Sequence, residues 1–191
     1  MRGIWRVISI LTDPFAEWAR IEHEPGDTFA LLTRTVAPLA LVPALFGFLG
    51  ACVIGVIVPG KGERHAPILD GVAAAVFGYV MSFAAVLLLG LVIALAAPLF
   101  GGRRNFANAL KLAVYSSIPV WLAGVFLLLP GLRFLMLLGC YGVYVLIAGL
   151  SPMTKTPTQN LPGFAALIVV FAGALMFIAW SAQAALFAGA V

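Results

Sequence analysis

Apolar residues along this chain form five long runs that are separated by short polar stretches. The runs cover residues 35–58, 71–99, 112–129, 132–150 and 161–187. A helix needs about 20 mainly apolar residues to cross about 30 Å of hydrocarbon, and the runs are close to that length or longer. The pattern therefore predicts an all-α, polytopic membrane protein in which residues 34–191 form one domain of five transmembrane helices.

The first 33 residues have a different pattern, in which apolar and polar residues alternate with a helical period. An Asp-Pro pair provides a good helix start, and Phe15, Trp18 and Ala19 are expected to share one face. Two interpretations are open: a helix in the membrane interface, anchored by Trp5, Phe15 and Trp18, or a short helix packed under the bundle. We predict that residues 1–33 form an N-terminal, interfacial amphipathic helix.

The composition supports a membrane location. Hydrophobic residues make up 63% of the 191-residue chain and charged residues only 9%, whereas a soluble domain has about 25% charged residues. The formal net charge is +4, but the basic excess lies in short loops between apolar runs. There it indicates membrane topology and contact with lipid headgroups, so we expect no nucleic-acid partner.

The distribution of Lys and Arg predicts the orientation. One side carries eight of them, at positions 2, 6, 20, 34, 103, 104, 111 and 155, and the other carries three, at positions 61, 64 and 133. Basic residues are enriched on the cytoplasmic side of a membrane. The N-terminus is therefore predicted to be cytoplasmic, and five crossings place the C-terminus outside, in the periplasm of a bacterium.

Prolines and glycines predict the shape of the spans. Proline removes a backbone donor and strains the preceding turn, so Pro38 and Pro43 predict a bent first helix and Pro119 predicts a kink near residues 115–119. Two glycine pairs favour close helix packing: Gly47 with Gly50, and Gly139 with Gly142. Since a thin bundle of this kind leaves packing surfaces free, we expect self-association into a homo-oligomer.

Four segments contain no Asp, Glu, Lys, Arg or His: residues 71–99, 112–129, 134–150 and 156–191. Asp70, Lys111 and Lys155 directly precede the first, second and fourth of these segments. Ion and proton relays usually need such groups at depth, and the chain shows no carboxylate pair or metal-ligand set in its spans. We therefore predict a protein that is not an enzyme, with no cofactor and no metal. The acidic cluster at residues 22–27 lacks metal-ligand spacing and is interpreted as a solvated turn.

The candidate binding residues surround the start of the third run. They are Arg103, Arg104, Asn108, Lys111, Tyr115 and Lys155. A lysine one residue before a span commonly extends to lipid phosphates, and a grip on one headgroup or on an acidic partner is the more specific alternative. The first functional hypothesis is thus a non-enzymatic protein that organises membrane lipids or partner proteins through a basic cytoplasmic face.

A second hypothesis is a small transporter, channel or lipid scramblase. Its polar path would pass Tyr115, Ser116 and Ser117 beside the kink at Pro119, because broken helices often line substrate sites. The absence of deep charges weighs against it.

Four segments carry a family resemblance. They are residues 108–126 (NALKLAVYSSIPVWLAGVF), 129–132 (LPGL), 138–144 (LGCYGVY) and 153–157 (MTKTP). Together with DPFAEW at 13–18, they resemble the bacterial branch of the YIP (Ypt/Rab-interacting protein) domain family. The resemblance implies five transmembrane helices and a cytoplasmic N-terminus. Eukaryotic relatives are associated with Rab GTPases and vesicle traffic, but this chain's alanine-rich spans are similar to bacterial ones, where no Rab machinery is expected, and imply the inner membrane. The resemblance supplies no catalytic residue.

Overall fold

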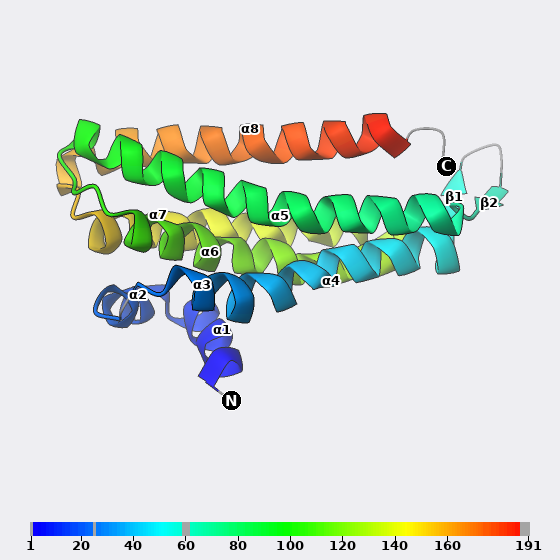
Figure 1. Cartoon of the computed structure of the whole chain (residues 1–191), viewed down its shortest axis with the longest axis horizontal. Helices are drawn as coiled ribbons and strands as arrows, with labels where there is room; N and C mark the ends of the chain where they lie inside the picture. Colours follow the sequence, from blue (N-terminus) through cyan, green and yellow to red (C-terminus); the bar gives the residue numbers. More distant parts are fainter. Residues whose placement is uncertain (1, 25, 59–61, 188–191) are drawn as a thin grey trace.

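The computed structural model describes residues 2–24, 26–58 and 62–187 (Figure 1). The N-terminal elements are α1 (Arg2–Thr12), α2 (Pro14–Glu22) and α3 (Thr28–Leu31). The rest are η1 (Leu32–Val36), α4 (Ala37–Phe48), η2 (Leu49–Ile54), β1 (Val56–Val58), β2 (Gly62–Arg64), α5 (Ile68–Ala96), η3 (Ala97–Phe100), α6 (Phe106–Ala123), η4 (Gly124–Leu128), η5 (Pro130–Cys140), α7 (Tyr141–Thr154), η6 (Thr158–Asn160) and α8 (Leu161–Phe187). The segments η1 and η2 are π-helical, whereas η3 to η6 are 3₁₀-helical.

Five helical stretches are long and apolar enough to cross a membrane, which confirms the predicted architecture. They are Thr28–Ile54, Ile68–Phe100, Phe106–Leu128, Gly131–Thr154 and Thr158–Ala185. The chain is an integral membrane protein with a helical bundle and short N-terminal helices. The 29 residues of α5 measure about 44 Å at about 1.5 Å per residue. Since the hydrocarbon layer is about 30 Å thick, α5 is too long to cross it upright, and it must tilt or extend beyond the layer.

Several span boundaries differ from the predicted limits, among them the start of the first span at Thr28, and two of the differences have a local cause. The first span ends at Ile54 because Gly55 has a φ angle of +84°, and the chain then forms β1, which pairs antiparallel with β2. The third helix begins at Phe106 rather than at residue 112, because the Asn105 side chain caps it by accepting a hydrogen bond from the Asn108 amide at 3.2 Å. Polar residues on the approach therefore belong to the helix.

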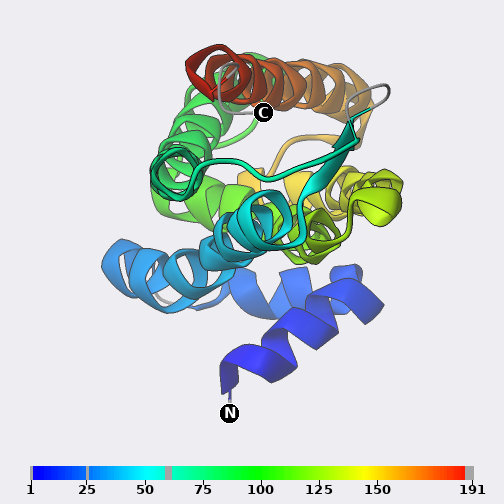
Figure 2. The same cartoon turned by 90° about the vertical axis from the view of Figure 1, so that its right-hand side faces the viewer.

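Helix α6 forms the centre of the bundle. It packs between α5 and α7, and α4 also contacts it (Figure 2). The most apolar part of its span is 67% buried inside the protein, whereas the equivalent part of the last span is 11% buried. Helix α8 lies along α5 at the outer edge of the bundle (Figure 1). Residues of α6 are thus surrounded by protein, and most of α8 faces the lipid.

Glycines let the spans approach closely, as predicted. A Cβ atom on Gly142 would overlap the Ser116 carbonyl oxygen, and one on Gly50 would overlap the carbonyl oxygen of Leu127. At Gly139 the added atom would lie 3.2 Å from Cα of Val120. Three of the four predicted glycines therefore make backbone contacts that a side chain would prevent, whereas Gly47 has ordinary van der Waals space.

The prolines lie in differently built helices. The first span changes to π-helical turns on both sides of α4, which contains Pro38 and Pro43. In contrast, α6 continues through Pro119 as one α-helix, so the kink there stays a prediction. The Ser117 hydroxyl donates to the carbonyl of Ala113 at 2.8 Å, and the buried Ser116 hydroxyl has no hydrogen-bond partner among the described residues.

The bundle has two distinct ends. Helix α2 lies beside one end of it, and strands β1 and β2 lie at the other (Figure 1). We call these the α2 end and the hairpin end. Helix α1 runs underneath the bundle, crossing the direction of the spans, as the view along the bundle shows (Figure 2). The N-terminal helices are therefore packed on the side of the bundle and are not separate from it.

Candidate functional site

The second helix is docked on the bundle by its tryptophan. Trp18 is fully buried, and its indole Nε1 donates to the carbonyl of Val145 in α7 at 3.0 Å. Its ring meets that of Tyr115 edge-on at 6.1 Å, and Gly149 provides the space for it. Trp18 is therefore no lipid anchor, which corrects the interfacial interpretation for this residue; Trp5 and Phe15 are exposed.

The buried face of α2 differs from the predicted one. It consists of Pro14, Glu17, Trp18 and Ile21, which have the i, i+3, i+4, i+7 spacing of an amphipathic helix. The predicted face consisted of Phe15, Trp18 and Ala19 and did not include Glu17. Glu17 can lie on the buried face because its carboxylate pairs with Arg6 of α1.

Lys111 caps the C-terminal end of α2. Its side chain is only 5% exposed, and its Nζ donates to the carbonyls of Ile21 at 3.1 Å and Glu24 at 2.6 Å. The last carbonyls of a helix lack partners within the helix and carry partial negative charge. The buried ammonium group satisfies one such carbonyl, that of Ile21, and the Glu24 carbonyl just beyond the helix. It ties α2 to α6 over about 90 residues of sequence.

Arg6 is the centre of the ionic network between α1, α2 and α6. Its guanidinium donates to both carboxylate oxygens of Glu24, with one N–O distance of 2.6 Å, and to the hydroxyl of Tyr115 at 3.2 Å. Its Nε also lies 3.4 Å from the buried carboxylate of Glu17, which is paired with Arg20 as well. The hydrogen bond to Glu24 raises the pKa of Arg6 above its usual value.

Lys155 joins the loop after α7 to α2. It forms an ion pair with Glu22, and its φ of +57° is unusual for a residue other than glycine. The hydroxyls of its buried neighbours, Thr154 and Thr156, lie 2.8 Å apart and are hydrogen-bonded. The MTKTP motif therefore places two threonines inside the protein and directs the lysine toward α2. The hydrogen bond from Lys155 lowers the pKa of Glu22 below its usual value.

The acidic cluster is not a simple solvated turn. Glu22 and Glu24 form ion pairs, and the carboxylate of Asp27 caps α3 by accepting from the Ala30 amide at 2.9 Å. His23 and Asp27 are exposed, as the prediction requires, whereas Glu22 and Glu24 are partly buried. No group of three or more possible metal ligands occurs in the described part of the chain.

The predicted binding residues divide into two groups. Lys111, Tyr115 and Lys155 contact the N-terminal segments. Lys111 and Tyr115 are buried there, whereas the Lys155 side chain is still 48% exposed. Arg103 and Arg104 are exposed, and neither has a side-chain partner among the described residues. Asn108 is partly buried. Glu17 and Arg6 were missed. The helical spacing of Pro14, Glu17, Trp18 and Ile21 could have identified Glu17.

The residues proposed for a polar path are used within the bundle. Tyr115 is buried and accepts from Arg6, Ser117 bonds to its own helix, and the Ser116 carbonyl faces Gly142. These contacts place protein atoms directly around residues 115–117 of α6. The geometry thus favours a structural role for this part of the third span.

The five spans, together with helices α1 and α2, make up nearly the whole chain. A comparison with protein families gives a match of similar extent. The model of the Yip1 domain matches residues 8–181. The chain belongs to the Yip1 domain family. The matched range includes α2 and the end of α1 from residue 8 onward, so the Yip1 domain here extends beyond the five spans. No curated protein and no solved structure matches the chain.

Proposed function

We propose that this Yip1-domain protein is a non-enzymatic organiser of the membrane that binds anionic lipid headgroups at its α2 end. We place this end at the cytoplasmic surface of a bacterial inner membrane, with the C-terminus in the periplasm. The excess of Lys and Arg on the N-terminal side supports this orientation. The family match supports the membrane location.

The observation that carries the proposal is the free arginine pair in the loop between η3 and α6. Arg103 and Arg104 are exposed, whereas Arg6, Lys111 and Lys155 already bind acidic groups or carbonyls of this chain. The loop is fixed on both sides of the pair, because the Arg103 amide donates to the Thr154 carbonyl at 2.7 Å and Asn105 caps α6. Guanidinium groups bind phosphate with two parallel hydrogen bonds.

Exposed aromatic residues on the N-terminal helices support binding at the same membrane surface. Trp5 on α1 and Phe15 on α2 are exposed, and aromatic side chains of this kind favour the headgroup boundary. The amphipathic helix α1 crosses the direction of the spans (Figure 2), which is the orientation of a helix in the plane of the interface. An acidic membrane protein is the alternative partner, and self-association stays a prediction.

Spin-labelled lipids in reconstituted vesicles test the proposal. The fraction of motionally restricted phosphatidylglycerol, relative to phosphatidylcholine, is measured for the wild type and for Arg103→Gln with Arg104→Gln. Each basic residue near an anionic surface contributes about 1 kcal/mol, so we expect the double variant to lose most of the preference for phosphatidylglycerol.

The matched control is Arg20→Gln with Lys155→Gln. It removes the same formal charge at the same end, but from side chains that are paired with Glu17 and Glu22. We expect this variant to keep the lipid preference. An equal loss in both double variants would reduce the effect to net charge and contradict a site at the arginine pair.

A further inference from the structure

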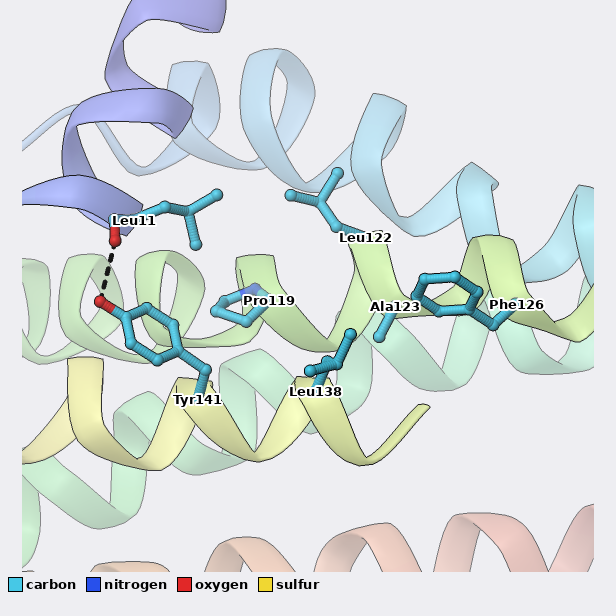
Figure 3. A pocket seen from close by; sticks show the side chains of 7 residues that line it. All are labelled: Leu11, Pro119, Leu122, Ala123, Phe126, Leu138 and Tyr141. Atoms are coloured by element: carbon cyan, nitrogen blue, oxygen red, sulfur yellow. Dashed lines mark hydrogen bonds between the residues drawn. The ribbon is translucent and has the colours of Figure 1, made fainter. Parts of the chain in front are cut away.

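An apolar groove lies between α1, α6 and the start of α7. Its volume is about 410 Å³, within the range of about 300–1,000 Å³ that is usual for ligand pockets. The lining residues are Leu11, Pro119, Leu122, Ala123, Phe126, Leu138 and Tyr141. Leu11 and Tyr141 mark one end and Phe126 the other, while the side chains of the two spans face each other across the space (Figure 3).

The groove lies at the depth of the hydrocarbon layer. The charged network at Lys111 marks the polar boundary on α6. At about 1.5 Å per residue, Pro119 and Phe126 lie roughly 12 and 22 Å further along the third span, and the hydrocarbon layer is about 30 Å thick. The groove is therefore in contact with lipid tails and not with water.

The lining offers nothing to a polar ligand. Six of its seven side chains are hydrocarbon, and the one hydroxyl, that of Tyr141, donates to the carbonyl of Leu11 at 2.8 Å (Figure 3). A polar solute would lose its hydration here without gaining hydrogen bonds. Hydrocarbon chains are the apolar molecules available at this depth of a bilayer.

Two residues shape the groove for a chain. Ala123 leaves room in the floor because its side chain is a single methyl group, and Leu138, 59% exposed, gives lateral access from the lipid. Leu11 covers the end at Tyr141, so α1 limits how far a chain can extend toward the α2 end. From these observations we propose that the groove holds one acyl chain of a membrane phospholipid, independently of the headgroup site at the arginine pair.

Photo-crosslinking from within the groove tests this. The full chain carries p-benzoylphenylalanine in place of Leu138 and is reconstituted into vesicles of phosphatidylethanolamine and phosphatidylglycerol. The matched probe position is Ile178 on α8, which is 60% exposed and lies outside the groove. After irradiation, intact mass spectrometry measures the yield and mass of the adducts.

We expect phospholipid adducts at position 138 in several-fold higher yield than at position 178. Ala123→Leu fills the floor and should reduce the yield at 138 to that at 178, without changing the yield at 178. If Ala123→Leu does not fold, Leu122→Trp fills the opposite wall. Equal yields at both positions, insensitive to the filling variant, would overturn the proposal, and so would an adduct with the mass of a second copy of this chain.

Discussion

The two ends of the bundle are held together by different forces. At the α2 end, charged side chains join segments that are far apart in sequence. Arg6 binds Tyr115, Lys111 binds the carbonyl of Ile21, and Lys155 pairs with Glu22. Toward the hairpin end, glycine and proline contacts hold the first span against the third, with Gly50 against the Leu127 carbonyl and Gly124 against Pro43.

The helices themselves also differ between the two ends. Toward the hairpin end, the first span finishes in the π-helical η2, and the third and fourth spans meet through the 3₁₀-helical η4 and η5. A 3₁₀ stretch as long as the 11 residues of η5 is uncommon. In lipid, helices associate through van der Waals packing rather than the hydrophobic effect, and small residues let their backbones approach. Directed polar contacts therefore define the α2 end, and steric fit defines the hairpin end.

The largest expected effect comes from removing the ammonium group at the α2 end. Lys111→Met keeps the length of the side chain but leaves the carbonyls of Ile21 and Glu24 without their donor. A hydrogen bond to a charged group contributes about 1.5–3 kcal/mol, so we expect a loss of about 3 kcal/mol and a lower thermal midpoint in detergent. Arg104→Met, at an exposed position, is the control and should leave the midpoint unchanged; equal midpoints for both variants would contradict the buried role of Lys111.

A smaller effect is expected from crowding the hairpin end. The added methyl group of Gly50→Ala overlaps the Leu127 carbonyl, and overpacking of this kind costs about 1–3 kcal/mol. Gly173→Ala is the control, since a Cβ atom there meets nothing within 4 Å and alanine favours a helix by up to about 1 kcal/mol. We expect Gly50→Ala to lower the thermal midpoint and Gly173→Ala to raise it. A change in the same direction in both variants would contradict steric fit at Gly50.

The smallest effect is expected at the ion pair between Glu22 and Lys155. Because the hydrogen bond lowers the pKa of Glu22 in the folded protein, its contribution is present above the unfolded value of about 4.3 and is lost as the pH falls through the folded value. The pair is partly exposed, so it contributes less than about 1 kcal/mol. Thermal midpoints of wild type and Glu22→Gln should differ slightly near neutral pH and converge as the pH falls through the lowered pKa of folded Glu22; a difference that persists in stronger acid would exclude this carboxylate as the cause.

The sequence predicted the five spans because length and hydrophobicity determine them independently of neighbouring segments. It also predicted the close approach at Gly142, because a glycine in any membrane helix lets a neighbouring backbone approach closely. The docking of α2 was not predictable in this way. Glu17 and Lys111 are charged, and a periodic pattern assigns charged residues to solvent or lipid headgroups unless their partners are known.

The partners of these charges come from distant parts of the chain. Lys111 binds backbone carbonyls, which have no sequence signature, and Arg6 lies well over 100 residues from Tyr115. Arg103 and Arg104 are exposed, whereas Lys111 and Lys155 bind groups of this chain, and the binding role of all four residues stays a prediction. The sequence shows where basic residues cluster, but the structure is needed to show which of these side chains have no partner among the described residues.

Hydrogen exchange in lipid nanodiscs tests the docking of the N-terminal helices most directly. If Lys111 ties α2 to the bundle, amides of residues 14–24 in the wild type exchange slowly, and Lys111→Met accelerates their exchange while leaving the amides of α8 unchanged. Fast exchange of residues 14–24 in the wild type, or protection that Lys111→Met does not alter, would contradict the account.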